Sequence, residues 1–307
     1  MKNFKKLLTT LLLLCSTMAF AENVVIDGIV YELDTTTLEA TITVGESKYK
    51  GDVVIPSVIV YNDATYNVTN IGAKAFYECS ELTKITIPNS VTNISARAFE
   101  NCVELTELEI PSSITNIGNY AFKGCVKLTN VTIPNSVENV GRSSFENCTG
   151  ITDIIIGSGV KNIYNGAFKQ CEKLVNVYCL ATTVPYAVIN AFSKVSVESV
   201  TLYVPIEAIN DYKTTEPWNS FGTIIELDEE TTNIANITIV GDVDSSNGNI
   251  FVTSPLEGEC VVVYTSNGTL VGTDAITNGS ATIHTDLLKG TVVIVKIGKI
   301  AFKTIMQ

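Results

Sequence analysis

The sequence predicts a mainly β protein, in which a solenoid of 23-residue repeats is followed by a small C-terminal β-sandwich. The first observation behind this prediction is a repeat whose opening asparagine recurs without slippage, at Asn70, Asn93, Asn116, Asn139 and Asn162. Each copy also contains a short stretch with the two-residue period of a β-strand, such as Ile85–Ile87. Finally, residues 237–307 contain short β-like runs separated by Asn-Gly turns, which are typical of hairpins.

The first 21 residues are typical of a secretion signal. Residues 1–6 are basic, residues 7–14 form a short apolar run, and Ala19-Phe20-Ala21 is a small-residue cleavage site. The apolar run is too short for a transmembrane helix, which takes about 20 residues, and no other stretch is long enough. We therefore expect a secreted protein, extracellular or on the outer cell surface. The alternative is a lipoprotein cleaved at Cys15, although the preceding Leu13-Leu14 is bulkier than the small residues expected there.

The balance of charge excludes two classes of partner. Without the signal, which contains Lys2, Lys5 and Lys6, the chain has 17 basic and 32 acidic residues, a net charge of −15. Nucleic-acid binding needs clustered Lys and Arg against the phosphates. Electrostatic attachment to anionic lipid needs the same excess of positive charge. We expect neither nucleic acid nor a lipid surface as a partner.

The pattern within one copy explains why the copies are repeated. In the first copy Phe76, Cys79 and Leu82 are three residues apart, as on one helical or 3₁₀ turn, and Pro88 ends the strand. A single such coil cannot bury its apolar side, whereas stacked coils bury it against each other. A period of 23 also lies in the range of leucine-rich repeats, about 20–29 residues. We expect a continuous parallel ladder of the segments Ile85–Ile87, Leu108–Ile110, Val131–Ile133, Ile154–Ile156 and Val177–Cys179.

A cysteine stands in the middle of every copy, in a column beside the phenylalanines. The column consists of Cys79, Cys102, Cys125, Cys148 and Cys171. Neighbouring coils about 4.8 Å apart are close enough for disulfides, and export permits them. However, side chains of a ladder point in parallel into the core, and a mature chain with seven cysteines leaves at least one unpaired. We interpret the column as small buried hydrophobic residues and not as a metal ladder, because ligands in a line do not form a tetrahedron.

The repeated pattern NIGxxAFxxCxxLTxxxIPxSVT resembles the BspA-like leucine-rich repeats of bacterial surface proteins, from Asn70 to about Val184. The flanking segments resemble parts of the same proteins as they occur in Bacteroidetes. Residues 22–69 resemble their N-terminal cap of short β-hairpins, and TLYVPIEAINDYKTTEPWNSFGTIIEL resembles their closing element. The resemblance implies that the solenoid and its lid span residues 70–226, with Tyr212, Trp218 and Phe221 as the apolar lid. Such lids are needed because an open end exposes the core.

A second module is expected after an acidic linker. Residues 227–236 have no apolar period, and residues 237–307 alternate runs such as CVVVYT and TVVIVKI with turns. The segments VVVYTSNGTLV and LLKGTVVIVKIGKIAFKTIMQ resemble the C-terminal sorting domain of the Bacteroidetes type IX secretion route. The module departs from that family at Val293, where Tyr is usual, and at its Met306-Gln307 end, where a basic residue is common.

No motif of catalysis or cofactor binding occurs, so we expect no enzyme, no cofactor and no catalytic or metal site. HExxH, GxSxG and the P-loop are absent, and His284 is the one histidine. A lone histidine in a strand is more often structural than catalytic. The run DVDSSNGN from Asp242 suggests a calcium loop, but its glycine is at the seventh position and Thr253 stands at the twelfth. We interpret this run as a hairpin turn.

The outward positions of the predicted strands are the candidate binding face. They form two columns: Lys84, Glu107, Asn130, Asp153 and Asn176 in one, and Thr86, Glu109, Thr132, Ile155 and Tyr178 in the other. These positions vary between copies while the inward ones hardly change. Variation of this kind is typical both of a binding face and of a plain solvent face. The apolar pair Ile155 and Tyr178 favours binding.

The resemblance implies an adhesion role. The expected function is a non-enzymatic secreted or cell-surface binding protein, whose partner is a host matrix protein, another cell or a surface glycan. The alternative is a structural spacer or envelope-layer protein without a specific ligand, in which the solenoid only projects or packs. The sequence leaves the oligomeric state open.

Overall fold

The computed structural model describes residues 22–227 and the segments 249–253, 260–265, 270–275, 277, 280–284, 292–297 and 300–305. The chain divides into two compact units, Met1–Glu226 and Leu227–Gln307, and we describe each by itself. Several expectations lie outside the described residues: the secretion signal with Cys15, the linker beyond residue 227, and the calcium-like run from Asp242.

The N-terminal segment folds into hairpins that close one end of the solenoid. Its strands are β1 (Glu22–Ile26), β2 (Ile29–Asp34), β3 (Glu39–Ile42), β4 (Lys50–Val54), β5 (Val58–Tyr61) and β6 (Ala64–Ile71). The β5–β6 hairpin turns at Asn62 and Asp63, both with φ near the left-handed region (49° and 60°), as a tight two-residue turn requires. The β1–β2 hairpin turns in the same way at Asp27 and Gly28. The cap then joins the repeats, because β3 and β6 pair in parallel.

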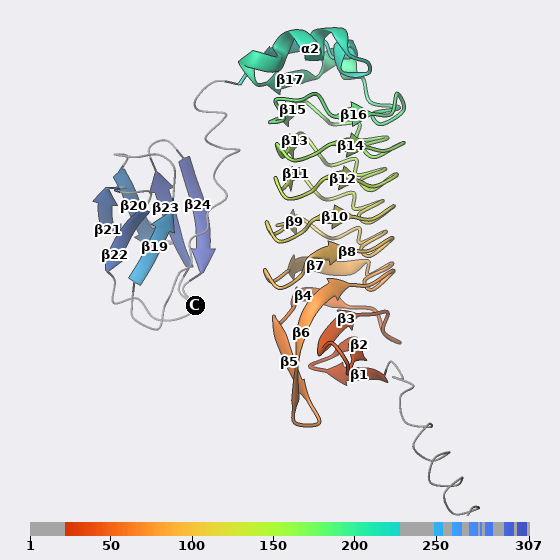
Figure 1. Ribbon diagram of the computed structural model, residues 1–307, viewed down its shortest axis with the longest axis vertical. Helices are drawn as coiled ribbons and strands as arrows, with labels where there is room; N and C mark the ends of the chain where they lie inside the picture. Colours follow the sequence, from red (N-terminus) through yellow and green to blue (C-terminus); the bar gives the residue numbers. More distant parts are fainter. Residues whose placement is uncertain are drawn as a thin grey trace, which may run out of the picture. The chain divides into compact units, whose positions relative to one another are not determined.

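The longest ladder of the solenoid is one that the sequence pattern did not predict. The strands that extend it are β8 (Asn93–Ile94), β10 (Asn116–Ile117), β12 (Asn139–Val140), β14 (Asn162–Ile163) and β16 (Tyr186–Ala187). They follow β6 in parallel, one per coil (Figure 1). The side-chain amides also join: Asn93 donates to Asn70 at 2.7 Å, and Asn116 donates to Asn93 at 2.9 Å. This amide ladder explains why every copy opens with asparagine.

The expected ladder exists, but the prediction that it is continuous is wrong. One part is β4 with β7 (Glu81–Thr86) and β9 (Glu107–Leu108). The other part is β11 (Asn130–Ile133), β13 (Asp153–Ile156), β15 (Asn176–Cys179), β17 (Thr201–Val204) and β18 (Thr223–Glu226). The backbone pairing stops between β9 and β11, although Ile110 and Ile133 are both buried there. The two-residue period fixes which side chains face inward, but it does not fix whether two backbones come within hydrogen-bond distance.

The segment after each Asn-Ile pair is a series of tight turns and not a helix. In the first coil the N–H groups of Ala75, Tyr77 and Cys79 donate to carbonyl oxygens three residues back. The N–H groups between them donate to the next coil, as Phe76 does to Ala98. This alternation needs left-handed backbone at two positions per coil, such as Lys74 (φ 60°) and Glu78 (φ 57°) in the first. The turns therefore bond within a coil and between coils at once, which a helix cannot do.

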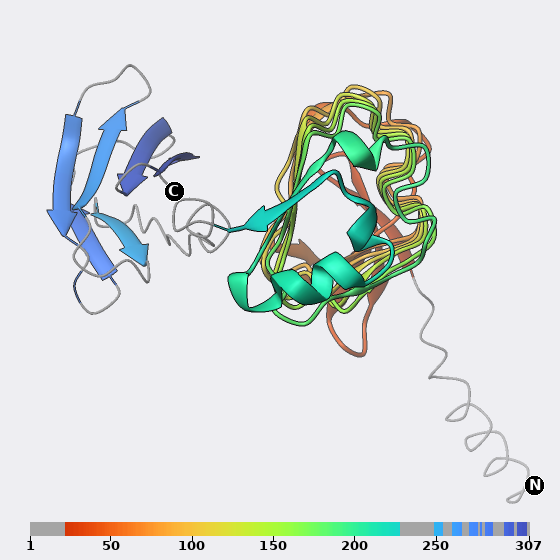
Figure 2. The same ribbon diagram turned by 90° about the horizontal axis from the view of Figure 1, so that it is seen from above.

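The core is a stack of identical side chains. Phe76, Phe99, Phe122, Phe145 and Phe168 are fully buried. Consecutive rings are nearly parallel and 4.9–5.6 Å apart between centroids, in the order of the coils. A sixth, less regular coil contains β16 and Phe192. Tyr49 of the cap packs on the first ring, and Phe192 packs on the last. Seen along the stack, the coils superpose on one closed outline (Figure 2).

The cysteine column is buried beside these rings as free thiols. Each thiol from the second to the fifth coil donates to the phenylalanine carbonyl of the coil before it, as Cys102 does to Phe76 at 3.1 Å. A cysteine therefore combines a small apolar volume with a weak donor that joins neighbouring coils. Burial raises the pKa of the Cys148 thiol to about 12, and burial raises that of Cys179 to about 11.

This arrangement predicts two rates of thiol modification. In the mature protein, a disulfide-exchange reagent at pH 8 should react quickly with Cys260, which is exposed, and slowly with the six buried thiols. The physical reason is that the thiolate reacts and burial suppresses it. Unfolding without reductant should then release all seven thiols. Two or more disulfides among the repeat cysteines, found by mass spectrometry of the unreduced protein, would contradict this prediction.

The far end of the solenoid is closed by a short helical segment. It comprises three 3₁₀ turns and the helix α2 (Ile209–Thr214), which lies across the last coils (Figure 2). Tyr212, Trp218 and Phe221, the residues expected to form the lid, are buried there. The Tyr212 hydroxyl donates to the Ala181 carbonyl at 2.8 Å, and the Trp218 indole N–H donates to the Pro185 carbonyl at 2.9 Å. Each buried polar group of the lid therefore has a partner.

The described parts of the second unit are two antiparallel sheets. One contains β19 (Asn249–Thr253) and β22 (Ser280–His284). The other, in the order β21-β20-β23-β24, contains β20 (Cys260–Thr265), β21 (Leu270–Ala275), β23 (Val292–Ile297) and β24 (Ile300–Ile305). Ile250, Val261, Val263 and Ile283 are buried, so the described strands have an apolar interior.

Candidate binding surface

Nine of the ten residues that the sequence singled out lie on strands of this face, in the register expected for two columns, and Glu109 follows directly after β9 outside the paired backbone. Glu107 lies opposite Lys84, Asp153 opposite Asn130, and Asn176 opposite Asp153. In the second column Ile155 lies opposite Thr132 and Tyr178 opposite Ile155. The break between β9 and β11 divides the face into two parts. The part nearer the cap contains Lys84, Thr86, Glu107 and Glu109, and the other part contains the remaining six residues.

The part nearer the cap is charged and internally compensated. Lys84 lies 3.0 Å from Glu107, and Lys50 lies 2.7 Å from Glu81. These side chains are mostly exposed, so each ion pair contributes between about 0 and 1 kcal/mol. These pairs match the charges of four side chains and leave the exposed Glu109 carboxylate without an ion pair.

The other part of the face carries an apolar stripe, which we define as Ile155, Tyr178, Tyr203 and Ile225. The four residues are in register on β13, β15, β17 and β18. The rings of Tyr178 and Tyr203 are stacked, with centroids 4.5 Å apart and an interplanar angle of 20°. Ile225 is 40% exposed at the end of the stripe, and the other three side chains are half-buried.

The stripe corrects the sequence analysis in two ways. Ile155 and Tyr178 were expected to be exposed, but they are half-buried because each is covered by its neighbour in the column. Tyr203 and Ile225 were missed because their segments were assigned to the closing element. The alternating pattern of TLYV at residues 201–204 was the signal that could have found Tyr203.

Polar side chains border the stripe. The Asn176 amide donates to Asp153 at 2.8 Å, and the Thr152 hydroxyl donates to the other oxygen of the same carboxylate at 2.6 Å. This carboxylate is therefore held in place by two donors. An apolar centre with an oriented polar border is typical of protein-binding surfaces.

The amide ladder forms a second regular surface. An open depression of about 350 Å³ lies over Asn93, Asn116 and Asn139. A second of about 600 Å³ lies between β2 and the first coil, near Asn70 and Gly72. Neither depression is enclosed, so we regard both as parts of the ladder surface.

Within the described parts of the chain, no three His, Cys, Asp or Glu side chains gather closely enough to hold a metal ion. His284 is exposed at the end of β22, opposite Asn249. Among the same residues, no helix is long and apolar enough to cross a membrane.

Comparisons with known proteins agree with this architecture. The family described as "BspA type Leucine rich repeat region" matches six copies, at residues 57–175 and 92–215. The two matches together span residues 57–215, just over half of the chain. No curated protein sequence matches the chain.

One solved structure, with a TM-score above 0.5, shows the same fold, and two others are more distantly similar. The pneumococcal vaccine antigen PcpA has a TM-score of 0.54 at 18% identity, over 68% of this chain and 48% of that one. A leucine-rich repeat protein of T. pallidum has a TM-score of 0.48 at 24% identity, over 67% and 86% of the two chains. One from Bacteroides ovatus has a TM-score of 0.34 at 18% identity, over 66% and 76%. The chain spans about half the length of the pneumococcal protein, and at this identity the likeness concerns the fold alone.

Proposed function

The chain belongs to the family of BspA-type leucine-rich repeat proteins, and from this premise we propose that it is a non-enzymatic adhesion protein. It is exported to the outer cell surface and uses the strand face of its solenoid to bind a host matrix protein, another cell or a surface glycan. The observation that carries this proposal is the apolar stripe. Aromatic side chains set in a polar border are the usual centres of binding energy in protein interfaces.

Three further features support the proposal. Stacked repeats provide an extended, rigid surface, which is how solenoid proteins usually bind their partners. The rings of Tyr178 and Tyr203 are already stacked on each other. Binding a partner would therefore cost little side-chain entropy at these two residues. The N-terminal segment is typical of a secretion signal, which agrees with a role outside the cell.

A structural spacer is the second candidate. It is favoured by the compensated charges of the part nearer the cap, where Lys50–Glu81 and Lys84–Glu107 tie neighbouring strands together. A spacer needs only such contacts between its own coils. The two functions differ in whether the stripe contacts a partner.

A double substitution tests the stripe. Ile155→Ser with Tyr178→Ser should abolish most capture of whichever matrix protein or glycan the wild-type protein binds on an array. The stability should fall by only about 1 kcal/mol, because the two side chains are half-buried. The matched control is Val175→Ser with Tyr186→Ser, which removes two apolar side chains that are 51% and 65% exposed outside the stripe. Equal capture by all three proteins would contradict the proposed site, and no capture by the wild type would favour the spacer.

We propose that the C-terminal unit, residues 237–307, is the sorting or anchoring device that brings the solenoid to the surface. The support is its division into a separate compact unit and its resemblance to a sorting domain. A chain ending at Glu226 should keep the melting transition of the solenoid, because the lid already closes that end. It should remain in the periplasm, as cell fractionation with an antibody to the repeats would show. Surface display of the truncated chain at the wild-type level would contradict this role.

A further inference from the structure

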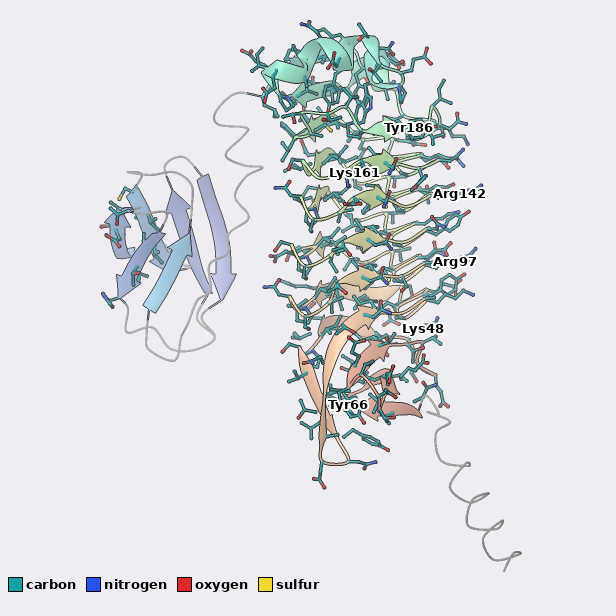
Figure 3. All side chains as sticks on the ribbon, in the orientation of Figure 1. Lys48, Tyr66, Arg97, Arg142, Lys161 and Tyr186 are labelled. Carbon is teal, nitrogen blue, oxygen red and sulfur yellow. The ribbon has the colours of Figure 1, made fainter. Side chains whose placement is uncertain are left out.

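A row of cations lies along the turns of the solenoid, away from the strand face. We call this row the basic edge. It consists of Lys48, Lys74, Arg97, Lys123, Arg142, Lys169 and Lys194. After Lys48, which belongs to the loop before β4, each coil from the first to the sixth contributes one cation. Figure 3 shows Lys48, Arg97 and Arg142 on the same edge of the stack, at successive heights.

Aromatic rings hold several of these cations in place. The Arg97 guanidinium lies 5.2 Å from the centroid of the Tyr120 ring, and the Lys123 ammonium lies 5.5 Å from the same centroid. The Lys48 and Lys74 ammonium groups lie 5.3 and 5.6 Å from the centroid of Tyr77. A cation–π contact orients a cation without cancelling its charge. The basic edge is therefore ordered and still positively charged.

Carboxylates compensate only part of this charge. The same turns carry Glu78, Glu100 and Glu146, three carboxylates against seven cations. Glu146 lies 2.9 Å from Lys169 and 3.7 Å from Lys123, and Glu100 lies 3.7 Å from Arg97. Within the described residues, the remaining four cations make no ion pair: Lys48, Lys74, Arg142 and Lys194.

Four of the six described lysines elsewhere on the solenoid and its lid show the contrast, and the other two, Lys173 and Lys213, make no ion pair. Lys50, Lys84, Lys127 and Lys161 each lie 2.6–3.0 Å from a glutamate of a neighbouring coil or strand. Positive charge is thus neutralised at these four positions, whereas several cations gather unpaired on the basic edge. The excess is local, because the chain as a whole is strongly acidic.

We propose that the basic edge is a second binding site, whose ligand is a linear acidic polysaccharide with about one carboxylate or sulfate per sugar. Successive cations are one coil apart, about 4.8 Å along the axis, which is comparable with the length of one sugar residue in an extended chain. The cations stand in two adjacent columns of the turns, with Lys74 and Arg97 in one, Arg142 one residue before that position, and Lys123 and Lys169 in the other. This narrow band fits a single polymer chain. This site is separate from the strand face and does not depend on its function.

The spacing argues against nucleic acid as the ligand. Duplex DNA carries a charge every 1.7 Å or so of its axis and presents two strands, which one sparse row cannot follow. The three carboxylates within the row would repel so dense a polyanion more strongly than a sparse one. The net negative charge of the chain opposes every polyanion at long range, so binding must depend on close contacts and weaken as salt screens them.

The proposal is tested by retention of the mature protein on immobilised polygalacturonate and on chondroitin sulfate, with neutral dextran as the blank. The wild-type protein should be retained on at least one acidic polymer at low salt and released as salt increases. Lys48→Gln, Lys74→Gln and Arg142→Gln together should weaken binding about tenfold or more, since they remove three of the four unpaired cations. These side chains lie outside the core, so thermal melting should show a folded protein.

The matched control is Lys50→Gln, Lys127→Gln and Lys161→Gln, which changes the net charge by the same amount at neutralised positions. This control should bind within about twofold of the wild type, because its lysines already have partners. Three results would overturn the proposal: no retention of the wild type on either acidic polymer, equal loss in both triple variants, or preferential displacement by duplex DNA over free polysaccharide.

Discussion

Replacing Phe122 with alanine is expected to lower the free energy of unfolding of the solenoid by about 3–5 kcal/mol. Phe122 is fully buried in the third of the five regular coils, and its ring is 5.2 Å from the rings of both Phe99 and Phe145. The cavity left by alanine is lined by both neighbours, and neither can move without leaving its own stack. Urea denaturation followed by circular dichroism measures the change.

The control for Phe122 is Thr132→Ala in the same coil. Thr132 is exposed on the strand face, so its replacement should change stability by no more than about 0.5 kcal/mol. A loss below about 1 kcal/mol for Phe122→Ala would show that the ring column is not the core.

The second large effect is expected at the lid. Trp218→Ala should cost about 3–5 kcal/mol, because Trp218 is fully buried and packs edge-on against Phe192 and Tyr212. The substitution also leaves the Pro185 carbonyl without its indole donor, which adds an unsatisfied buried group. The end of the stack would then expose the last ring of the column, so melting should begin there.

A milder change at the same end separates packing from hydrogen bonding. Tyr212→Phe keeps the ring but removes the hydroxyl that donates to the Ala181 carbonyl, and it should cost only about 1–2 kcal/mol. Hydrogen exchange should report faster opening of the last coils in Trp218→Ala than in Tyr212→Phe. The reverse order would show that the lid is held by its hydrogen bonds and not by its packed rings.

The repeat itself made most of the solenoid predictable. A phenylalanine recurs every 23 residues, always three residues before a cysteine. This spacing indicates coils in which equivalent residues of successive copies stack on each other. The lid could also be predicted, because the large apolar residues Tyr212, Trp218 and Phe221 follow the last coil. In both cases buried apolar side chains determine the structure, and these residues can be recognised in the sequence.

Features that depend on backbone contacts were harder to predict. The pairing of Asn70 with Asn93 gives the longest ladder, yet a two-residue strand has too few positions for a recognisable period. The break after Leu108 falls between coils whose sequence patterns are nearly equal, so the pattern contains no signal of it. The alternating turns around Lys74 and Glu78 follow from bonds to a neighbouring coil, which no single copy contains.

The candidate surfaces were predictable to different extents. The two outward columns followed from strand alternation, but the stacking of Tyr178 on Tyr203 joins a regular coil to the closing element, where the repeat no longer applies. The basic edge was hidden because Lys74, Lys123 and Arg142 occupy different positions in their copies and come together only when the coils stack.

The most direct test of the proposed binding face is oxidative footprinting of the tyrosines in the presence and absence of a captured partner. Tyr178 and Tyr203 lie on the stripe, and Tyr164 and Tyr186, which are 42% and 65% exposed, lie outside it and serve as internal controls. We predict that the partner protects Tyr178 and Tyr203 and leaves the two control tyrosines as reactive as before. Unchanged oxidation of Tyr178 and Tyr203, with protection of Tyr164 and Tyr186 instead, would contradict the account.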